Sequence, residues 1–201
     1  MDGIEQFTRH FLAVYFLMIG LYYSSRSYAL SERMGFTHIH YGRRWGATWW
    51  YRHLFNLFRA GILLVCVLRV PFDVDQWLGV IGWLYHPLVL AVGVLLLLLA
   101  YVVIIYVQAY MHQDWRSGID PDGGRTLVTT GPFARSRNPL FLGILTGQLG
   151  FFLALPSLFA LICLLVGATV IVLQARAEEK ALRREFGEPY EAYCRQVARW
   201  L

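Results

Sequence analysis

Long apolar runs alternate with shorter polar segments along the whole chain. Five runs are long enough, or nearly so, for a helix to cross the apolar core of a membrane, which takes about 20 residues. These runs cover residues 7–24, 50–70, 88–108, 139–155 and 157–174. The pattern predicts an all-α integral membrane protein with about five transmembrane helices.

The third run is preceded by further apolar residues, so that the stretch 77–108 is longer than one crossing needs. His86 and Pro87 interrupt this stretch, and proline disfavours a helical conformation in the residue before it. We therefore assign residues 77–85 to a short segment at the membrane interface, where tryptophan and tyrosine are enriched.

The fourth and fifth runs are separated by little more than Pro156. So short a connection predicts a tight antiparallel helical hairpin. A helix rises about 1.5 Å per residue, which places Glu178 and Glu179 roughly one to two turns beyond the membrane surface. We therefore expect the two glutamates to be neighbours of Arg137 and Asn138, which stand at the other end of the hairpin.

The composition agrees with a membrane protein. Of the 201 residues, 57% are hydrophobic, and the net charge of +5 comes almost wholly from arginine, because Lys180 is the single lysine. We expect one membrane domain, with three spans in residues 1–110 and a loop, the hairpin and a helical tail in residues 111–201. The basic charge indicates topology and anionic head groups rather than nucleic acid.

The arginines also predict which side of the membrane each segment faces. Arg26, Arg33, Arg43, Arg44 and Arg52 lie in or at the edge of the connection between the first two spans. Cytoplasmic connections are enriched in arginine and lysine. We therefore expect the N-terminus outside, and the C-terminus and the polar end of the hairpin in the cytoplasm.

Cysteine and histidine positions indicate neither a metal site nor a disulfide framework. Cys66 and Cys163 lie inside apolar runs, and Cys194 has no partner at metal-ligand spacing. The histidines near the second run complete no set of metal ligands. We therefore expect no bound metal.

The residues at the entrance of the fourth run suit an anion. Pro139 is favourable in the first turn of a helix, and Asn138 before it can cap the free N–H groups. A helix N-terminus and the guanidinium fork of Arg137 both favour a carboxylate or a phosphate. The alternative is an arginine that only neighbours a lipid head group.

Glu178 and Glu179 follow the fifth run within an arginine-rich stretch. One interpretation is a solvated helix face with ion pairs four residues apart, such as Glu179 with Arg183. The other is a site for the ammonium group of a zwitterion, because the hairpin directs the two carboxylates toward Arg137.

Gly143, Gly147 and Gly150 recur at helical spacing in the fourth run. Small residues allow close helix packing in membranes, and we interpret Gly147 and Gly150 in this way. Gly143 lies nearer the polar entrance, and it fits either helix packing or contact with a bound ligand.

Arg52, Asn56 and Arg59 share one face of the second run. An arginine as deep as Arg59 normally faces protein or a cavity. We interpret the three residues as a binding site for an anionic lipid or substrate group. Snorkelling to the interface and an internal partner remain the alternatives.

The second half of the chain carries several spaced motifs. They are Trp115-Arg116-x-Gly118-Ile119, Leu127-Val128, Gly131-Pro132-Phe133, Arg137-Asn138-Pro139-Leu140-Phe141-Leu142-Gly143, Glu178-Glu179-x-x-Leu182 and Phe186-Gly187-x-x-Tyr190-x-x-Tyr193. Over residues 112–199 they resemble the isoprenylcysteine carboxyl methyltransferase family, to which the phospholipid N-methyltransferases are related. The resemblance implies a membrane enzyme that uses cytosolic S-adenosylmethionine and a lipophilic substrate from the bilayer.

The resemblance also implies which residues form the site. The cofactor-binding residues would be Leu127, Val128, Gly131, Phe133, Arg137, Asn138, Pro139, Phe141, Gly143, Glu178 and Glu179. Arg137 would bind the methionyl carboxylate, a glutamate the amino group, and an aromatic ring the adenine or the sulfonium. The candidate catalytic residues are Glu178, Glu179 and Arg176.

Three positions differ from the eukaryotic members that the motifs resemble. Asn138 stands in place of histidine, Phe141 in place of tyrosine, and Gln174 in place of arginine. The acceptor therefore stays open between a lipophilic carboxylate, a lipid amine and a small thiol. A non-catalytic membrane assembly factor with the same hairpin is the alternative from another class.

Overall fold

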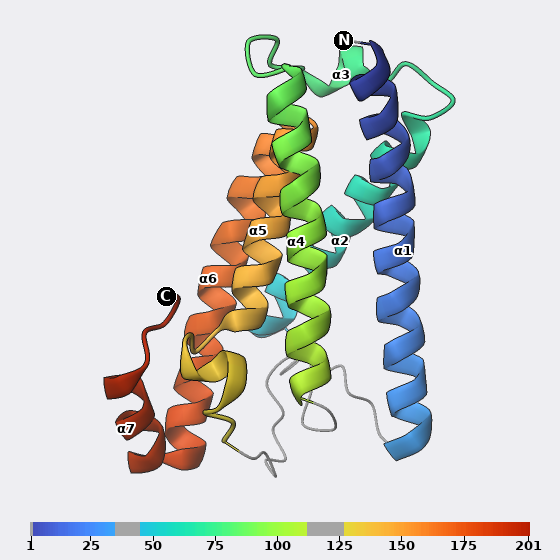
Figure 1. Ribbon diagram of the computed structural model, residues 1–201. Coiled ribbons are helices and arrows are strands. Elements are labelled where there is room, and N and C mark those ends of the chain that lie inside the picture. Colours follow the sequence, from blue (N-terminus) through green and yellow to red (C-terminus); the bar gives the residue numbers. More distant parts are fainter. Residues whose placement is uncertain (1, 35–44, 112–126) are drawn as a thin grey trace.

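The computed structural model describes residues 2–34, 45–111 and 127–201, and every secondary-structure element named within them is a helix (Figure 1). Five longer helices run side by side, and three short ones lie at the ends of the bundle. The longer helices are α1 (Asp2–Met34), α2 (Ala47–Leu68), α4 (Pro87–Met111), α5 (Pro139–Ala154) and α6 (Leu158–Phe186). The short ones are α3 (Asp75–Leu78), the 3-10 helix η2 (Gly131–Ala134) and α7 (Glu188–Gln196). The prediction of an all-α fold is confirmed.

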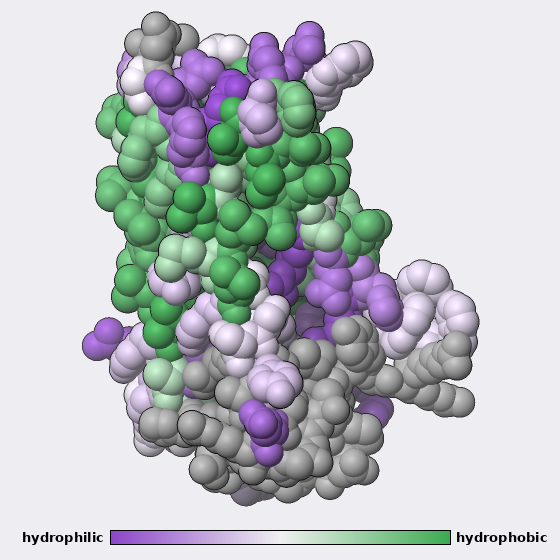
Figure 2. Space-filling view, turned by 90° about the vertical axis from the view of Figure 1, so that its right-hand side faces the viewer, coloured by the Kyte–Doolittle hydropathy of each residue, from purple (hydrophilic) through white to green (hydrophobic). Residues whose placement is uncertain are grey.

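The described residues include three helices that are long and apolar enough to cross a membrane, namely α2, α4 and α6. The helix α5 is equally apolar but shorter. Figure 2 shows the matching surface, a broad band of hydrophobic residues with hydrophilic residues gathered above and below it. The protein is therefore an integral membrane protein. The helix α1 is long enough but more polar, and its crossing stays a prediction.

The predicted hairpin of the last two spans is confirmed. Only residues 155–157 separate α5 from α6, and the two helices run antiparallel (Figure 1). The hydroxyl of Ser157 accepts a hydrogen bond from the backbone N–H of Ala160 at 3.1 Å and so caps α6. At the same tip, the backbone N–H of Ile81 donates to the carbonyl oxygen of Pro156 at 2.9 Å. The segment predicted at residues 77–85 therefore covers the tip of the hairpin and does not span.

The glycine stripe of α5 packs against α4. A Cβ added at Gly150 would lie 2.9 Å from the backbone nitrogen of Leu97, and one at Gly147 would lie 3.3 Å from the Cβ of Ala100. On the opposite helix, a Cβ added at Gly93 would overlap the backbone of Ala154. The interpretation of Gly147 and Gly150 as packing residues is confirmed, and the partner helix is α4.

The close approach of α4 and α5 leads to a stability prediction. Gly93→Ala is expected to lower the free energy of unfolding by about 1–3 kcal/mol, because the added methyl group must displace the backbone of α5. Thermal unfolding in detergent micelles measures the effect. Gly61→Ala is the matched control, since its Cβ meets nothing within 4 Å, and its unfolding midpoint should not fall. Equal midpoints for the two variants would contradict this packing.

A buried ion cluster ties α1, α2 and α3 together at the end of the bundle that holds the hairpin tip. Arg69 is 1% exposed, and its Nε donates to Oδ1 of Asp75 at 2.6 Å. Arg9 of α1 donates to the other oxygen of Asp75 at 2.7 Å and to the carbonyl oxygen of Arg69 at 3.0 Å. The charges of this cluster are paired, although Nη1 of Arg69 has no hydrogen-bond partner among the described residues. The start of α5 and the end of α6, where the site residues were predicted, lie at the opposite end of the bundle.

Candidate active site

Glu179 is the centre of a buried ion cluster at the end of the bundle where α5 begins. Glu179 is 4% exposed, and each of its two carboxylate oxygens accepts a hydrogen bond from Arg199 at 2.9 Å. The side-chain amide of Asn138 donates to Oε1 at 3.1 Å, and Nη1 of Arg137 lies 3.6 Å from Oε2. The expectation that Arg137, Asn138 and the glutamates are neighbours is confirmed for Glu179.

The tail after α7 forms part of this cluster, and the contacts of its Arg199 were not predicted. Its backbone follows residues 136–138: the N–H of Arg137 donates to the carbonyl oxygen of Ala198 at 3.0 Å. The carbonyl oxygen of Arg199 accepts from Asn138 Nδ2 at 3.1 Å and from the hydroxyl of Ser136 at 3.3 Å. The end of the chain is thus fastened to the start of α5 by both backbone and side chain.

The predicted capping role of Asn138 is wrong. Asn138 does occupy the position before α5, and Pro139 lies in the first turn as predicted, but the asparagine side chain makes no capping hydrogen bond. Its amide is instead directed to Glu179 and to the backbone of Arg199. The two bonds donated by Nδ2 fix the orientation of the amide, and the bond to the charged carboxylate is worth more than a cap between neutral groups.

The helix α7 holds Arg137 and η2 in place. Gly187 ends α6 with a φ of 57°, and α7 follows with Pro189 in its first turn, as predicted. Nη1 of Arg137 donates to the sulfur of Cys194 at 2.7 Å. The hydroxyl of Tyr193 donates to the carbonyl oxygen of Phe133 at 2.7 Å. Burial raises the pKa of Tyr193 to about 12, against the opposing charge of Arg137, so this hydroxyl stays protonated and remains a donor.

The segment before η2 lies against the end of α4. Gly131 has a φ of +59°, and a Cβ there would overlap the ring of Tyr110. The Tyr110 hydroxyl and the Thr130 hydroxyl share a hydrogen bond of 2.6 Å. Leu127 and Val128 are half-buried in the same segment. The predicted motif residues from Trp115 to Ile119 lie outside the described residues.

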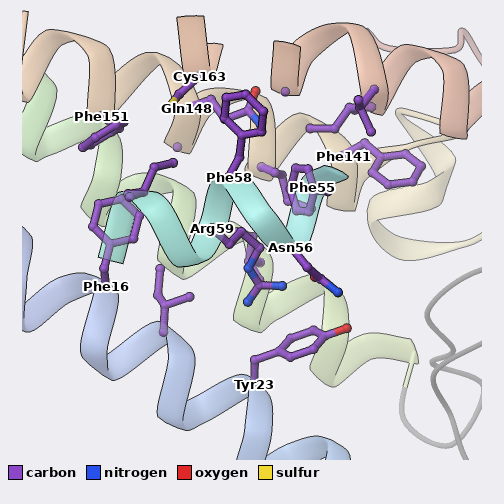
Figure 3. A pocket seen from close by; sticks show the side chains of 18 of the residues that line it. Phe16, Tyr23, Phe55, Asn56, Phe58, Arg59, Phe141, Gln148, Phe151 and Cys163 are labelled. Carbon is purple, nitrogen blue, oxygen red and sulfur yellow. The ribbon is translucent and has the colours of Figure 1, made fainter. Parts of the chain in front are cut away.

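A cavity of about 420 Å³ lies between α1, α2, α4, α5 and α6 (Figure 3). Both sets of predicted binding residues contribute to its wall: Phe141 and Glu178 from the cofactor set, and all three members of the acceptor set, Arg52, Asn56 and Arg59. The other predicted cofactor residues do not line it. Arg176 is exposed on α6 and lies outside the lining.

The cavity has a polar side and an aromatic side, which lie on two faces of α2. Figure 3 shows Asn56 and Arg59 directed toward Tyr23 of α1, whereas Phe55 and Phe58 point toward α5 and α6. The guanidinium carbon of Arg59 lies 4.8 Å from the centre of the Tyr23 ring. Within the described part of the chain, Arg59 forms no ion pair with a carboxylate. The polar side therefore offers an arginine charge to an anion.

Neighbouring carboxylates on α6 have different surroundings. Successive residues of a helix differ by about 100° in direction, so Glu178 and Glu179 cannot face the same side. Glu179 is enclosed by the ion cluster, whereas Glu178 lines the cavity and accepts a hydrogen bond from Nε2 of Gln174 at 2.9 Å. The sequence predicted both as equivalent candidates, and the structure separates them.

Gly143 lies in the packed surface between α5 and α4. It is buried, and an added Cβ would lie 3.0 Å from Cγ1 of Ile104. This contact supports the packing interpretation at this position as well. Contact of Gly143 with the cofactor stays a prediction.

Comparison with known proteins places the chain in a family. The phospholipid methyltransferase family matches residues 88–189, just over half of the chain, which include α4, α5, α6 and the start of α7. No curated protein and no solved structure shows a significant match. The matched family includes the isoprenylcysteine carboxyl methyltransferase-like enzymes that the motifs resemble. The chain therefore belongs to the phospholipid methyltransferase family and is a membrane enzyme that uses S-adenosylmethionine.

Proposed function

We propose that this enzyme methylates a lipophilic acceptor that carries an anionic group and enters the cavity from the bilayer, as an isoprenylcysteine carboxyl methyltransferase-like enzyme would. One observation carries the proposal. The same cavity is lined by Phe141 and Glu178, at the end where the cofactor is expected, and by the polar residues of α2. A methyl donor and an acceptor bound to these two sets would share one space, and proximity supplies much of the catalysis in such a transfer.

The residues at this end of the bundle fit S-adenosylmethionine, which supplies an electrophilic methyl group when bound. Nε of Arg137 is buried and donates no hydrogen bond to any of the described residues, so it can serve a carboxylate. Phe141 at the cavity wall can lie beside a sulfonium cation, which aromatic faces attract. The other predicted cofactor residues lie close to Arg137 and Phe141 along the chain, and we keep them as proposed cofactor contacts. They are Leu127, Val128, Gly131, Phe133, Asn138, Pro139 and Gly143.

We assign different roles to the two glutamates. Both oxygens of Glu179 already accept hydrogen bonds from Arg199, which makes Glu179 a positioning residue for the corner. Glu178 lines the cavity, and Gln174 orients it. Glu178 is therefore our candidate for the ammonium group of the cofactor or for a proton released by the acceptor.

The acceptor class follows from the charge on α2. Arg59 offers a guanidinium group to the cavity, Asn56 lies on the same side, and Arg52 also lines the cavity. An arginine in a membrane span is retained where it serves a ligand or a partner. A carboxylate acceptor is already ionised and needs no base, whereas an amine or a thiol must first lose a proton. For this reason our proposal takes a lipophilic carboxylate as the acceptor, ahead of the amine and thiol alternatives.

The site is expected to face the cytoplasm. The corner around Glu179, the end of α6 and α7 lie at one end of the bundle (Figure 1), and this end includes the basic residues Arg183, Arg184 and Arg195. The positive-inside rule supports a cytoplasmic position for them. The N-terminus lies at the opposite end of the bundle, so it would then face the outside, and α1 would be the first of the five predicted spans.

Transfer of an isotopically labelled methyl group to a lipid extract tests the acceptor class. Label released by mild base indicates an ester and hence a carboxylate acceptor, whereas N-methyl label resists base and would support the lipid amine. Calorimetric titration with S-adenosylhomocysteine tests the enzyme itself. Absence of saturable binding would contradict the proposal and favour a non-catalytic assembly factor.

The role of Glu178 has its own prediction. Glu178→Ala is expected to weaken binding of S-adenosylhomocysteine about tenfold or more, because a hydrogen bond between charged groups contributes about 1.5–3 kcal/mol. Calorimetric titration measures the affinity, and thermal unfolding confirms that the variant is folded. Glu185→Ala, an exposed position on the same helix, is the control and should bind as the wild type does. Wild-type affinity in Glu178→Ala would contradict the assignment.

A further inference from the structure

An amide group lies on the aromatic side of the cavity among apolar neighbours. Phe55 and Phe58 of α2 face this side, and Phe151 and Cys163 lie around it (Figure 3). Gln148 of α5 is directed into the same space. It is the single amide side chain of α5, in a helix that is otherwise apolar apart from Thr146.

The carbonyl oxygen of Gln148 lacks a donor. Oε1 is buried and accepts no hydrogen bond from the described residues. The hydroxyl of Tyr15, which lines the same cavity, donates to the backbone of Leu97 at 2.7 Å, and that of Thr146 on the same helix donates to the backbone of Leu142 at 2.9 Å. A buried acceptor without a partner is unfavourable, above all where lipid excludes water. Each such group calls for an explanation.

The position of the amide is set by the helix next to it. A Cβ added at Gly167 of α6 would overlap the Gln148 amide. Because Gly167 has no side chain, the Gln148 amide can lie directly against α6 at the wall of the cavity. Gln148 is seven residues beyond Phe141, which corresponds to about 10 Å along α5. The amide is thus well away from the end of the cavity where the methyl donor is expected.

We propose that the acceptor carries a hydroxyl group within its apolar part and that Gln148 binds this group. The inference rests on the proposed function and narrows its substrate class to amphiphiles with two polar groups. One is the anionic group, which the arginines of α2 bind. The other is a hydrogen-bond donor held by Oε1 of Gln148, with the aromatic side chains around the apolar segment between them. Gln148 is then a specificity residue and not a catalytic one.

Paired probes test this inference. Octanoic, dodecanoic and hexadecanoic acids are compared with their terminally hydroxylated counterparts, by calorimetric titration of the full-length protein in detergent with S-adenosylhomocysteine present. At least one hydroxy acid is expected to bind about fivefold to tenfold more tightly than its parent acid, the gain of one hydrogen bond to a buried acceptor. Equal affinity within every pair would overturn the inference.

Two variants connect the effect to Gln148. Gln148→Met keeps an unbranched side chain of similar length but removes the acceptor, so the preference for the hydroxy acid should disappear while the parent acid binds as before. Gly167→Ala should have the same effect, because the added methyl group displaces the amide. A preference that persists in both variants would overturn the assignment to Gln148.

The same samples separate this inference from the proposed function. If S-adenosylhomocysteine does not bind to the wild type, the proposed function fails. If S-adenosylhomocysteine binds but the paired acids do not differ, the proposed function stands and only the role of Gln148 is lost. Unchanged affinity for S-adenosylhomocysteine in Gln148→Met shows that the variant is folded.

Discussion

Replacing Glu179 with alanine is expected to release the C-terminal tail and to weaken binding of S-adenosylhomocysteine at least tenfold. The substitution leaves Arg137 and Arg199 without the carboxylate that both of them contact. Breaking a buried ion pair costs about 3–5 kcal/mol, and we expect about 3 kcal/mol here, because the Arg199 side chain is 35% exposed and water screens part of its charge. Thermal unfolding measures the loss, and limited proteolysis of the tail measures its release.

An exposed ion pair provides the control. Arg195 and Glu188 of α7 lie 2.6 Å apart, but their side chains are 64% and 75% exposed. Removal of such an exposed pair by Glu188→Ala should leave the free energy of unfolding nearly unchanged, because water screens both charges. An unfolding midpoint for Glu179→Ala as high as that of Glu188→Ala would contradict the central place of Glu179.

A double-mutant cycle separates the tail from the rest of the cluster. Arg199→Ala should be less destabilising than Glu179→Ala, because Asn138 and Arg137 remain next to the carboxylate. The double variant should lose less than the sum of the two single losses, since the two side chains interact directly. Strict additivity would show that Arg199 and Glu179 are not coupled.

The polar corner was predictable because it depends on quantities that hardly vary. The rise of a helix and the shortness of the connection at Pro156 together place the residues after α6 beside the residues before α5. Arg137, Asn138 and Glu179 therefore came together as predicted. The residues that share one face of a helix were equally predictable from their spacing. Arg52, Asn56 and Arg59, which were predicted to share a face, all line one cavity.

The partners within the corner were not predictable in the same way. A helical period identifies the face of a helix, but it does not say which distant segment covers that face. The glycine stripe therefore indicated packing without indicating α4. Likewise Arg199 lies 20 residues beyond Glu179, after a turn and a further helix, and no spacing rule connects the two. For the same reason, the hydrogen bonds of Asn138 to Glu179 and to the backbone of Arg199, in place of a helix cap, were not predicted.

Gln148 is a different kind of omission, because a signal for it was present. A strongly polar amide in the middle of an apolar span is costly unless it is hydrogen-bonded. The same reasoning identified Arg59 in the second span. The glycines of the fourth span indicate packing alone, whereas the structure shows that α5 packs on one face and lines the cavity with another.

Arg59→Met is expected to reduce kcat/KM for the lipid acceptor about tenfold or more without lowering the thermal stability of the protein. A hydrogen-bonded charge pair between a guanidinium and an anion contributes about 1.5–3 kcal/mol to binding, and methionine keeps the apolar stem but removes the charge. Arg59 forms no ion pair with a carboxylate among the described residues, so the fold loses little with it. Initial rates at varied acceptor concentration measure the effect.

The comparison of stability with activity is what distinguishes a ligand-binding arginine from a structural one. If Arg59 only stabilises the packing of the helices, its removal should lower the unfolding midpoint. If it is retained for a ligand, its buried charge destabilises the fold, and its removal should leave the midpoint unchanged or raise it. Arg59→Lys keeps the charge without the fork and should recover part of the activity. Arg184→Met, at an exposed position near the end of α6, is the control and should change neither property. A lower midpoint with unchanged kcat/KM in Arg59→Met would make Arg59 a structural residue and remove the anionic acceptor from the proposal.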